Sequence, residues 1–323
     1  MKAIYIERQG SIDDLSVSEI PKPTIGPDDV LVKVEASGIN PSDVASLEGK
    51  FPAAVLPRVL GRDFAGKVVE GSPGLIGTEV YGTGGDLGVT RNGTHAEYVA
   101  IPREAAAPRP KNLSGEEAAA VGVPFISAFS ALVTRGQMKK GEWVIISGAA
   151  GSVGQAAVQI ASAEGARIVA LVKDASERWV ADSGQVQAVA QSDQGDLNRV
   201  VRQVTNGKGA DLALNVVGGS IFGDILEALG IGGRQVVISA AGGREFMLDL
   251  LTLYRNQFTL TGLDTQKLDA TMCAGILREL TPFFESGKLK PPVIQAKYPL
   301  AQAQQAYSRV ASGKGGKVVF VMA

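Results

Sequence analysis

The residues that most clearly predict chemistry form a run of small side chains, Gly148-Ala149-Ala150-Gly151-Ser152-Val153-Gly154. The run follows an apolar strand pattern at 144–147 and opens into an amphipathic helical pattern at 153–163. At such a turn Gly151 lets the backbone approach phosphate oxygens, and Gly154 lets the helix pack closely against the strand. The helix N-terminus adds unpaired N–H groups and a partial positive charge, so the run predicts a site for a dinucleotide pyrophosphate.

The glycine pattern by itself is weak evidence. It reads G-x-x-G-x-x-G, because Ala149 stands where the usual fingerprint has glycine, and 40 of the 323 residues are glycine. A strand–helix turn without a ligand is the alternative. A second apolar strand pattern at 168–172 completes a strand–helix–strand unit, which favours cofactor binding. The candidate residues from this turn are Ala150, Gly151, Ser152, Val153 and Gly154.

The end of the second strand bears on the kind of dinucleotide. Folds that prefer NAD place an acidic residue there, whereas this chain has Val172 followed by Lys173. A lysine suits a 2′-phosphate, and Arg178, one turn into the next helical pattern, adds a second cation. Asp174 is a counter-signal, and Lys173 is also compatible with an ordinary surface position. We predict NADPH as the cofactor.

Few residues are available for a metal site. The chain has one cysteine, Cys273, and one histidine, His95. Structural zinc usually takes four Cys or His ligands, and catalytic zinc takes about three protein ligands, so neither kind of site is expected. Cys273 lies in an amphipathic helical pattern and is expected to pack in a core, and His95 is expected to be a structural residue beside a strand.

Length, charge and apolar patterning argue against several classes of protein. The length predicts about two domains. The 32 basic and 33 acidic residues give a formal net charge of −1, without a basic stripe, so nucleic acid is not an expected partner. The N-terminus is too polar for a signal peptide, and the apolar runs are shorter than a membrane span requires. We therefore expect a cytoplasmic protein.

The pattern of predicted secondary structure changes near residue 143. The first 120 residues suggest strands (30–36, 64–70 and 97–101), turns and irregular loops with frequent Gly and Pro. Strands and helices then alternate, which is typical of a doubly wound parallel sheet. The predicted strands are 144–147, 168–172, 186–189, 212–216, 235–239 and 258–262, and the predicted helices are 153–163, 176–183, 197–205, 221–229 and 248–255. Helices at 270–286 and 301–312 and a strand at 317–322 follow.

In this order the features resemble the zinc-free quinone oxidoreductase (zeta-crystallin-like) branch of the medium-chain dehydrogenase/reductase superfamily. The resemblance spans essentially the whole chain and rests on GINPSD at 38–43, GRDFAG at 61–66, the turn at 148–154, SAAG at 239–242 and GKVV at 316–319. It implies an α/β protein with a GroES-like, partly open β-barrel catalytic domain (1–123 and 263–323) and a Rossmann domain (124–262). Zinc-dependent members have Cys and His where this chain has Asn40 and Arg62.

The resemblance also implies roles for single residues. Asn40 resembles an asparagine that faces the nicotinamide, and Ser127 matches a threonine that contacts the nicotinamide ribose or amide. Asp43 and the pair Arg62-Asp63 resemble polar residues of the same cleft, although a structural ion-pair cluster is at least an equal reading. We expect Asn40, Asp43 and Ser127 to be catalytic. The further cofactor candidates, besides those already named and including Asn40 and Ser127, are Gln191, Val217, Gly218, Ser239, Ala240, Ala241 and Lys317.

The implied activity is hydride transfer from NADPH to a quinone. The first alternative is reduction of activated C=C bonds in enones, enals, acrylates or enoyl thioesters, for which Arg135, Lys139 and Lys140 are candidates for a phosphate-binding mouth. The second is a non-catalytic NADPH-binding protein, crystallin-like or RNA-binding. Ala45 stands where many members have a tyrosine near the nicotinamide, which leaves the substrate preference open. A homodimer is expected, with 231–237 and 258–262 pairing at a sheet edge.

Overall fold

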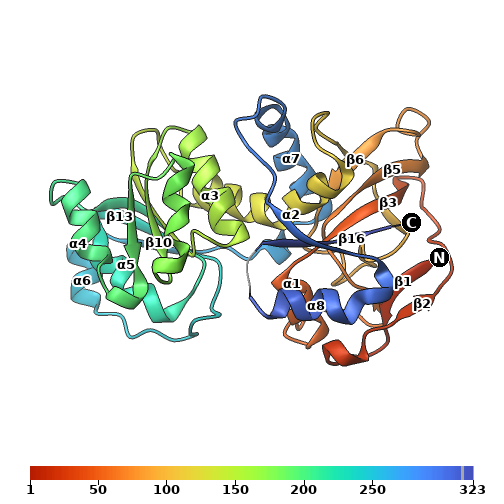
Figure 1. Cartoon of the computed structure of the whole chain (residues 1–323), viewed down its shortest axis with the longest axis horizontal. Helices are drawn as coiled ribbons and strands as arrows, with labels where there is room; N and C mark the ends of the chain where they lie inside the picture. Colours follow the sequence, from red (N-terminus) through yellow and green to blue (C-terminus); the bar gives the residue numbers. More distant parts are fainter. Residues whose placement is uncertain (314–315, 323) are drawn as a thin grey trace. The chain divides into compact units, whose positions relative to one another are not determined.

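The computed structural model describes residues 1–313 and 316–322. They form two compact units: one contains Met1–Ile126 and the segment that begins at Thr265, and the other is Ser127–Asp264 (Figure 1). The sequence placed these boundaries at 123/124 and 262/263. Each unit has its own sheets and hydrophobic core, and each is described separately below.

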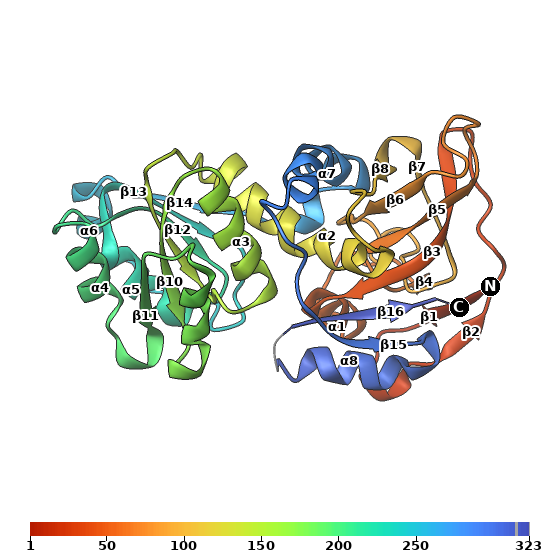
Figure 2. The same cartoon turned by 45° about the horizontal axis from the view of Figure 1, so that its top comes forward.

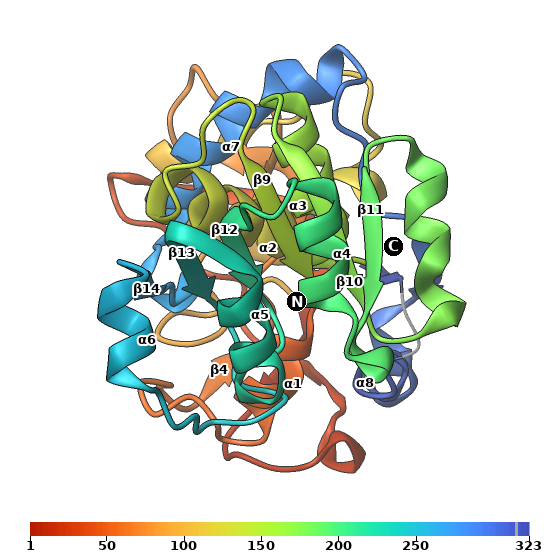
Figure 3. The same ribbon diagram turned by 90° about the vertical axis from the view of Figure 1, so that its left-hand side faces the viewer.

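The second unit is built on a six-stranded parallel sheet in the order β11-β10-β9-β12-β13-β14. The strands are β9 (Trp143–Ser147), β10 (Arg167–Val172), β11 (Ala188–Gln191), β12 (Ala210–Asn215), β13 (Leu229–Val237) and β14 (Thr259–Gly262). Strands β9, β10 and β12 are mostly apolar and almost entirely buried, as expected for parallel strands covered on both faces. Figure 3 shows the central strands with helices packed around them. The predicted doubly wound sheet is confirmed.

The helices of this unit are α3 (Ser152–Ala163), α4 (Leu197–Val204), α5 (Phe222–Ala228) and α6 (Leu250–Arg255), with 3₁₀ turns at Ala175–Ser183, Ser192–Gln194 and Gly219–Ile221. The helix predicted at 176–183 is therefore a 3₁₀ segment. Its N-terminus is capped by Asp174, whose carboxylate accepts the N–H of Ser176 at 2.8 Å. The core of the unit joins the sheet residues Ile145 and Val169 to Val201 on α4 and Ile225 on α5.

The predicted pairing of 231–237 across a subunit boundary is wrong for residues 234–237 of β13. Arg234–Val237 pair with β14 on one side, and residues of the same strand pair with β12 on the other. Both edges of β13 are therefore used within the sheet over residues 234–237, and β14 is the strand that ends the sheet on this side.

The first unit contains two sheets among its described residues (Figure 2). The larger has the order β15-β16-β3-β5-β6-β8, with β7 also paired to β3, and the smaller has the order β2-β1-β4. The strands are β1 (Lys2–Ile6), β2 (Val17–Glu19), β3 (Asp29–Ile39), β4 (Arg58–Val59), β5 (Phe64–Glu70), β6 (Glu79–Gly82), β7 (Tyr98–Pro102), β8 (Ala107–Pro108), β15 (Ile294–Tyr298) and β16 (Lys317–Val321). The C-terminal strand β16 lies antiparallel to β3, so segments far apart in the sequence share one sheet.

Helices in this unit correct the expectation of strands and loops alone before residue 120. Helix α1 (Pro41–Leu47) follows β3 directly, with Pro41 in its first turn, where a missing N–H costs nothing. Helix α2 (Gly115–Phe129) begins in this unit, and its last residues and the π-helical segment that continues it, Ser130–Arg135, belong to the second unit. Helices α7 (Ala270–Glu285) and α8 (Ala303–Ala311) lie in the C-terminal part, with 3₁₀ turns at Ile12–Asp14, Arg103–Ala105, Thr265–Lys267 and Leu300–Gln302.

One helical stretch, Gly115–Arg135, is long and apolar enough to cross a membrane by length and composition. The expectation that the apolar runs are shorter than a membrane span requires is wrong for this stretch. In the structure 78 % of its apolar window is buried, including Ala119, Val121 and Phe125, which are completely buried. This is the pattern of a core helix.

Candidate functional site

The turn between β9 and α3 has the geometry that its glycines predict. Gly148 has φ +57°, a left-handed conformation that favours glycine. A Cβ on Gly154 would lie 2.2 Å from the carbonyl oxygen of Gly148, so this position must be glycine for the helix to meet the strand. A Cβ on Gly151 would meet the same oxygen at 3.3 Å, which is close but not prohibitive. The protein itself therefore tolerates a side chain at Gly151, and the glycine leaves space that a ligand can fill.

The turn also offers hydrogen-bond donors. Gly151 is the N-cap of α3, and the first helical residues, Ser152, Val153 and Gly154, have N–H groups without a partner inside the helix. This twelve-residue helix directs the positive end of its dipole toward the turn. Candidate residues Ala150 to Gly154 thus form a backbone cradle suited to a pyrophosphate at the carboxyl end of β9.

The loops that follow β12 and β13 lie beside each other. Gly242 N–H donates to Val217 O at 2.7 Å, and Gly219 N–H donates to Gly243 O at 2.9 Å. The amide oxygen of Asn215 accepts the N–H groups of Val217 (3.0 Å) and Gly218 (2.9 Å). The structure therefore brings the candidates Val217, Gly218, Ser239, Ala240 and Ala241 into one cluster at the carboxyl ends of the strands.

The end of β10 carries charges of both signs. Lys173 and Arg178 are exposed. Asp174 is engaged by Ser176, whose N–H and hydroxyl both hydrogen-bond its carboxylate, and these bonds lower the pKa of Asp174. Glu177 was not singled out in the sequence, yet its carboxylate accepts the N–H of Lys173 at 2.8 Å. Gln191, at the end of the neighbouring strand β11, is 9 % exposed.

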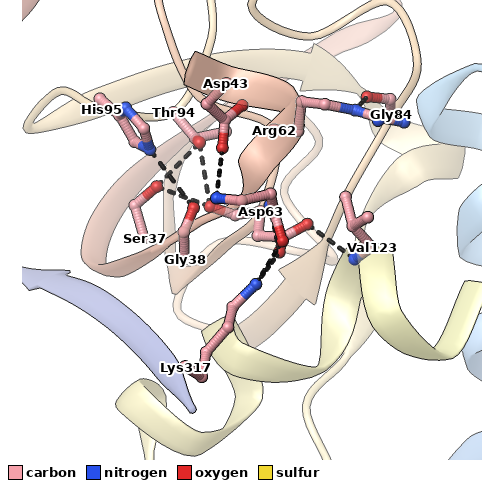
Figure 4. A network of polar contacts seen from close by, with 11 residues as sticks. Ser37, Gly38, Asp43, Arg62, Asp63, Gly84, Thr94, His95, Val123 and Lys317 are labelled. Carbon is pink, nitrogen blue, oxygen red and sulfur yellow. Dashed lines mark hydrogen bonds and ion pairs between the residues drawn. The ribbon is translucent and has the colours of Figure 1, made fainter. Parts of the chain in front are cut away.

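In the first unit, residues far apart in sequence form a buried polar network (Figure 4). Lys317 and Asp63 are 2 % and 0 % exposed, and their Nζ and Oδ2 atoms lie 2.9 Å apart. The amide nitrogen of Asn40 donates to the same Asp63 oxygen at 2.9 Å, and Lys317 donates to the amide oxygen of Asn40. The second oxygen of Asp63 accepts the N–H of Val123 at 2.9 Å.

This network fixes the orientation of the Asn40 amide. A carboxylate only accepts and an ammonium only donates, so the amide nitrogen must face Asp63 and the amide oxygen must face Lys317. The amide nitrogen has two N–H groups, and Asp63 takes one of them. The direction of the second N–H of Asn40 is fixed by the same two contacts.

Asp43 adds a titratable group beside Asn40. Its Oδ2 accepts the backbone N–H of Asn40 at 2.7 Å, and the residue is 2 % exposed. Burial, together with the negative charge of Asp63, raises the pKa of Asp43 to about 7. This carboxyl group therefore changes its charge near neutral pH.

His95 and Cys273, for which the sequence predicts structural roles, are both buried. His95 is fully buried, with Nδ1 2.8 Å from the hydroxyl of Tyr307 and Nε2 3.3 Å from Gly38 O. Burial lowers the pKa of His95 to about 4 and raises the pKa of Cys273 to about 12. The histidine is therefore a neutral packing residue at ordinary pH, and the cysteine is a thiol. No group of three or more His, Cys, Asp or Glu suited to a metal occurs in residues 1–313 and 316–322.

The contacts of three candidate lysines bear on their predicted roles. The Lys317 amine is buried and engaged by Asp63 and Asn40 in its own unit, and its contact with a cofactor stays a prediction. Lys139 and Lys140 precede β9, so they lie at the amino ends of the parallel strands, whereas the glycine turn lies at the carboxyl ends. A strand of five or six residues separates these ends by roughly 17–20 Å. This distance argues against a role for the two lysines in binding a ligand that lies at the glycine turn.

Ser127 lies on α2 in the second unit and is 4 % exposed. Asn40, Asp43 and the network lie in the first unit, so the predicted catalytic residues are divided between the two units. The sequence missed the part that Ser37 and Thr94 play, since both hydroxyls donate to the backbone oxygen of Asp63, at 2.6 and 2.9 Å. Single hydroxyl residues in strands and turns carry no local signal for such contacts.

Comparison with known families gives a consistent result. The Alcohol dehydrogenase GroES-like domain model matches residues 26–111, and the Zinc-binding dehydrogenase model matches residues 152–281. A zinc-type alcohol dehydrogenase-like protein of Schizosaccharomyces pombe is 38 % identical over 275 residues, which is 84 % of this chain and 80 % of that protein. The quinone oxidoreductase of Rattus norvegicus is 27 % identical and matches 100 % of this chain and 98 % of its own. A polyketide synthase subunit of Mycobacterium tuberculosis is 30 % identical over 98 % of this chain, which spans only 14 % of that subunit.

The structure is also similar to solved structures of other proteins. The CurK enoyl reductase superposes with a TM-score of 0.85 at 26 % identity, covering 100 % of this chain and 99 % of its own. The mycobacterial protein Rv1454c in complex with NADPH superposes with a TM-score of 0.85 at 25 % identity, covering 99 % of this chain and 100 % of its own.

Proposed function

Because the chain belongs to the quinone oxidoreductase-like branch of the medium-chain dehydrogenase/reductase superfamily and is an NAD(P)-dependent oxidoreductase, we propose that it transfers hydride from NADPH to quinones. The observation that carries the proposal is the oriented amide of Asn40, which has one N–H left for an oxygen of the acceptor. When hydride adds to a quinone, negative charge grows on oxygen, and a fixed donor stabilises that charge.

The residues proposed to hold the cofactor are those of the second unit. The backbone of Ala150 to Gly154 binds the pyrophosphate, and the loops at Val217–Gly218 and Ser239–Ala241 border the same end of the sheet. The reduced nicotinamide ring, when bound, supplies the hydride. Ser127 on α2 donates its hydroxyl to the ribose or amide of this end of the cofactor.

NADPH is preferred over NADH in this proposal because the end of β10 carries Lys173 and Arg178 and because Asp174 is occupied by Ser176. Glu177 opposes this preference, since a carboxylate at a strand end suits a ribose hydroxyl better than a phosphate. We therefore propose a moderate preference. A KM for NADH equal to or below that for NADPH would contradict it.

Asn40 and Asp43 have separate parts in the first unit. Asn40 donates to the acceptor oxygen, while Asp43 holds the backbone N–H of Asn40 and titrates near neutral pH. The acceptor gains a hydride at carbon, its π electron pair moves onto oxygen, and that oxygen takes a proton from water. With Asp43 adjacent, the rate of this proton uptake depends on pH close to 7.

A reductase of activated C=C bonds is the second candidate, supported by the similarity to the CurK enoyl reductase. The same Asn40 N–H serves both reactions, because an enone also develops negative charge on oxygen. The absence of a tyrosine at Ala45 leaves either acceptor possible.

We also propose a homodimer that forms through β14, the strand that ends the parallel sheet. Ile231, Leu250 and Tyr254, in or beside this part of the unit, are 78, 68 and 63 % exposed, which is unusual for large apolar side chains. Light scattering tests this proposal, and a monomer at working concentration would refute it.

The test of the function is oxidation of NADPH by the pure protein with a panel of acceptors: 1,4-benzoquinone, 9,10-phenanthrenequinone, an α,β-unsaturated ketone, an acrylate and an enoyl thioester. Turnover with the quinones supports the proposal, and faster turnover of an activated alkene transfers the assignment to the second candidate. Binding of NADPH with no turnover of any acceptor favours a non-catalytic protein.

A further inference from the structure

A hollow in the surface of the second unit lies where three of its parallel strands begin. It has a volume of about 490 Å³, which is within the range of small-molecule sites. It is lined by the residues that lead into β9, by the first residue of β10 and by the loop that joins α4 to β12. The glycine turn follows the other end of β9, so the hollow and the proposed pyrophosphate cradle lie at opposite ends of the sheet.

Four basic side chains line this hollow: those of Lys139, Lys140, Arg167 and Lys208. All four residues are exposed. Within residues 1–313 and 316–322, none of their side-chain nitrogens lies within 4.0 Å of a carboxylate oxygen. The four positive charges are therefore not balanced by ion pairs in this part of the chain.

The two carboxylates in the lining do not remove this excess of positive charge. Glu142 Oε2 forms an ion pair with Nη2 of Arg234 at 2.6 Å, and it also accepts the backbone N–H of Lys139 at 2.9 Å. Asp211 Oδ2 accepts the backbone N–H of Trp143 at 2.8 Å. With Glu142 balanced by Arg234, the lining keeps four positive charges against one negative charge. The whole chain has a formal net charge of −1, so the positive charge at the hollow is a local feature.

Arg167 is held in a defined position although it has no ion pair. Its Nε and Nη2 atoms both donate to Gly141 O, at 3.0 and 2.6 Å, and its Cζ lies 4.6 Å from the centre of the Trp143 ring. A guanidinium has five N–H donors, so three N–H groups of Arg167 remain for other acceptors. A guanidinium that is already oriented loses little freedom when it binds an anion in a bidentate manner.

We propose that this hollow is a second anion-binding site, which takes a small ligand that carries two or more linked phosphate groups. Arg167 supplies a planar fork that matches phosphate oxygens, and the three lysines supply point charges for the remaining oxygens. The cations come from three separate segments and surround one hollow, which suits a compact ligand better than an extended polymer. The inference does not rest on the proposed hydride transfer, because the cofactor cradle lies at the other end of the sheet.

The test measures the binding of inorganic tripolyphosphate to the full-length protein by isothermal titration calorimetry. Lys140→Gln/Lys208→Gln removes two of the cations and should weaken this binding at least about tenfold, because charge-assisted hydrogen bonds are lost. Arg167→Lys keeps the charge without the planar fork and should give a smaller loss. Orthophosphate should bind more weakly than tripolyphosphate, and raised salt should weaken both, because the cations are exposed.

The matched control is Lys111→Gln/Lys288→Gln, which removes two exposed lysines of the first unit that also have no ion pair among the described residues. This variant should bind tripolyphosphate like the wild-type protein. Tripolyphosphate bound at the glycine turn would be equally unaffected by both double variants, so the comparison distinguishes the hollow from the cofactor cradle. All the substituted lysines are exposed, and thermal unfolding confirms that each variant is folded.

Fluorescence gives a second, local measurement. The chain has two tryptophans, and Trp179 lies in the 3₁₀ segment that follows the carboxyl end of β10. In the variant Trp179→Phe the remaining tryptophan, Trp143, lines the hollow. Its fluorescence should change with tripolyphosphate at the dissociation constant found by calorimetry.

The proposal is overturned if tripolyphosphate does not bind, if the two double lysine variants bind it alike, or if orthophosphate binds as tightly. It is also overturned if a single-stranded oligonucleotide binds more tightly than tripolyphosphate through the same lysines, since the hollow would then be part of a nucleic-acid surface. These measurements need neither NADPH nor turnover, so their failure is distinguishable from a failure of the proposed reductase activity.

Discussion

The two candidate binding regions of this protein are made in opposite ways. The cradle in the second unit is made of backbone: glycines give room, and the N–H groups of one helix end give hydrogen bonds. The network in the first unit is made of buried charged side chains, with Lys317 paired to Asp63 across 254 positions of sequence. Backbone sites suit a ligand whose phosphate is the same in every reaction, whereas charged side chains here fix the orientation of one amide.

This difference explains what the sequence predicts. The six strands around the glycine turn follow from apolar runs that alternate with helical patterns, and the turn follows from residues within seven positions. The pairing of β16 with β3 and the contacts of Lys317 with Asn40 and Asp63 depend on residues more than 250 positions apart, and no local pattern encodes them. The sequence identified Asn40 and Lys317 through a family resemblance, but it assigned Lys317 to the cofactor and missed its partners.

Substitutions that break the charged network should cause the largest losses of stability and activity. Lys317→Met leaves the buried carboxylate of Asp63 without its counter-ion and should lower the free energy of unfolding by about 3–5 kcal/mol. The Asn40 amide also loses the donor that fixes its oxygen, so kcat of the folded fraction should fall roughly 10–100-fold. Urea unfolding and NADPH oxidation with a quinone measure the two effects.

The double variant Asp63→Asn/Lys317→Met separates the effect of the network on stability from its effect on kcat. It removes both charges, so most of the lost stability should return, while kcat should stay low because the orientation of Asn40 is no longer imposed. If the double variant recovers kcat as fully as it recovers stability, the network has only a structural role.

The backbone cradle should respond to two glycine substitutions in different ways. Gly154→Ala places a Cβ 2.2 Å from Gly148 O and should destabilise the second unit. Gly151→Ala places its Cβ 3.3 Å from that oxygen, so the fold should remain while the affinity for NADPH falls about tenfold or more, which is about 1.4 kcal/mol. Thermal unfolding and fluorescence titration with NADPH separate these results, and unchanged binding by Gly151→Ala would refute the cradle.

The charge network also predicts a pH effect on stability. The pKa of Asp43 is about 7 in the folded state against 3.8 for an ordinary carboxyl group, so the folded state holds this proton between these pH values. Its contribution to the free energy of unfolding is therefore present at low pH and is lost as pH rises through 7. Asp43→Asn should gain stability relative to the wild-type protein between pH 5 and pH 8, by on the order of 2–4 kcal/mol. Paired urea titrations at the two pH values measure this change, and a constant difference would contradict it.

The smallest expected effect concerns the nucleotide. Glu177→Gln removes a negative charge beside Lys173 and should raise the preference for NADPH over NADH a few-fold, because a 2′-phosphate is no longer repelled. Lys173→Ala should lower the preference by a similar factor. The ratio of kcat/KM for the two cofactors measures both, and a change in the opposite direction for either variant would show that the phosphate lies elsewhere.

The most direct test of the account is quinone-dependent oxidation of NADPH by the wild-type protein, Asn40→Ala and Gly151→Ala, measured under the same conditions. The account predicts turnover by the wild-type protein, a fall mainly in kcat for Asn40→Ala, and a rise mainly in KM for NADPH for Gly151→Ala. No quinone-dependent oxidation by the wild-type protein, or equal kinetics for all three proteins, would contradict it.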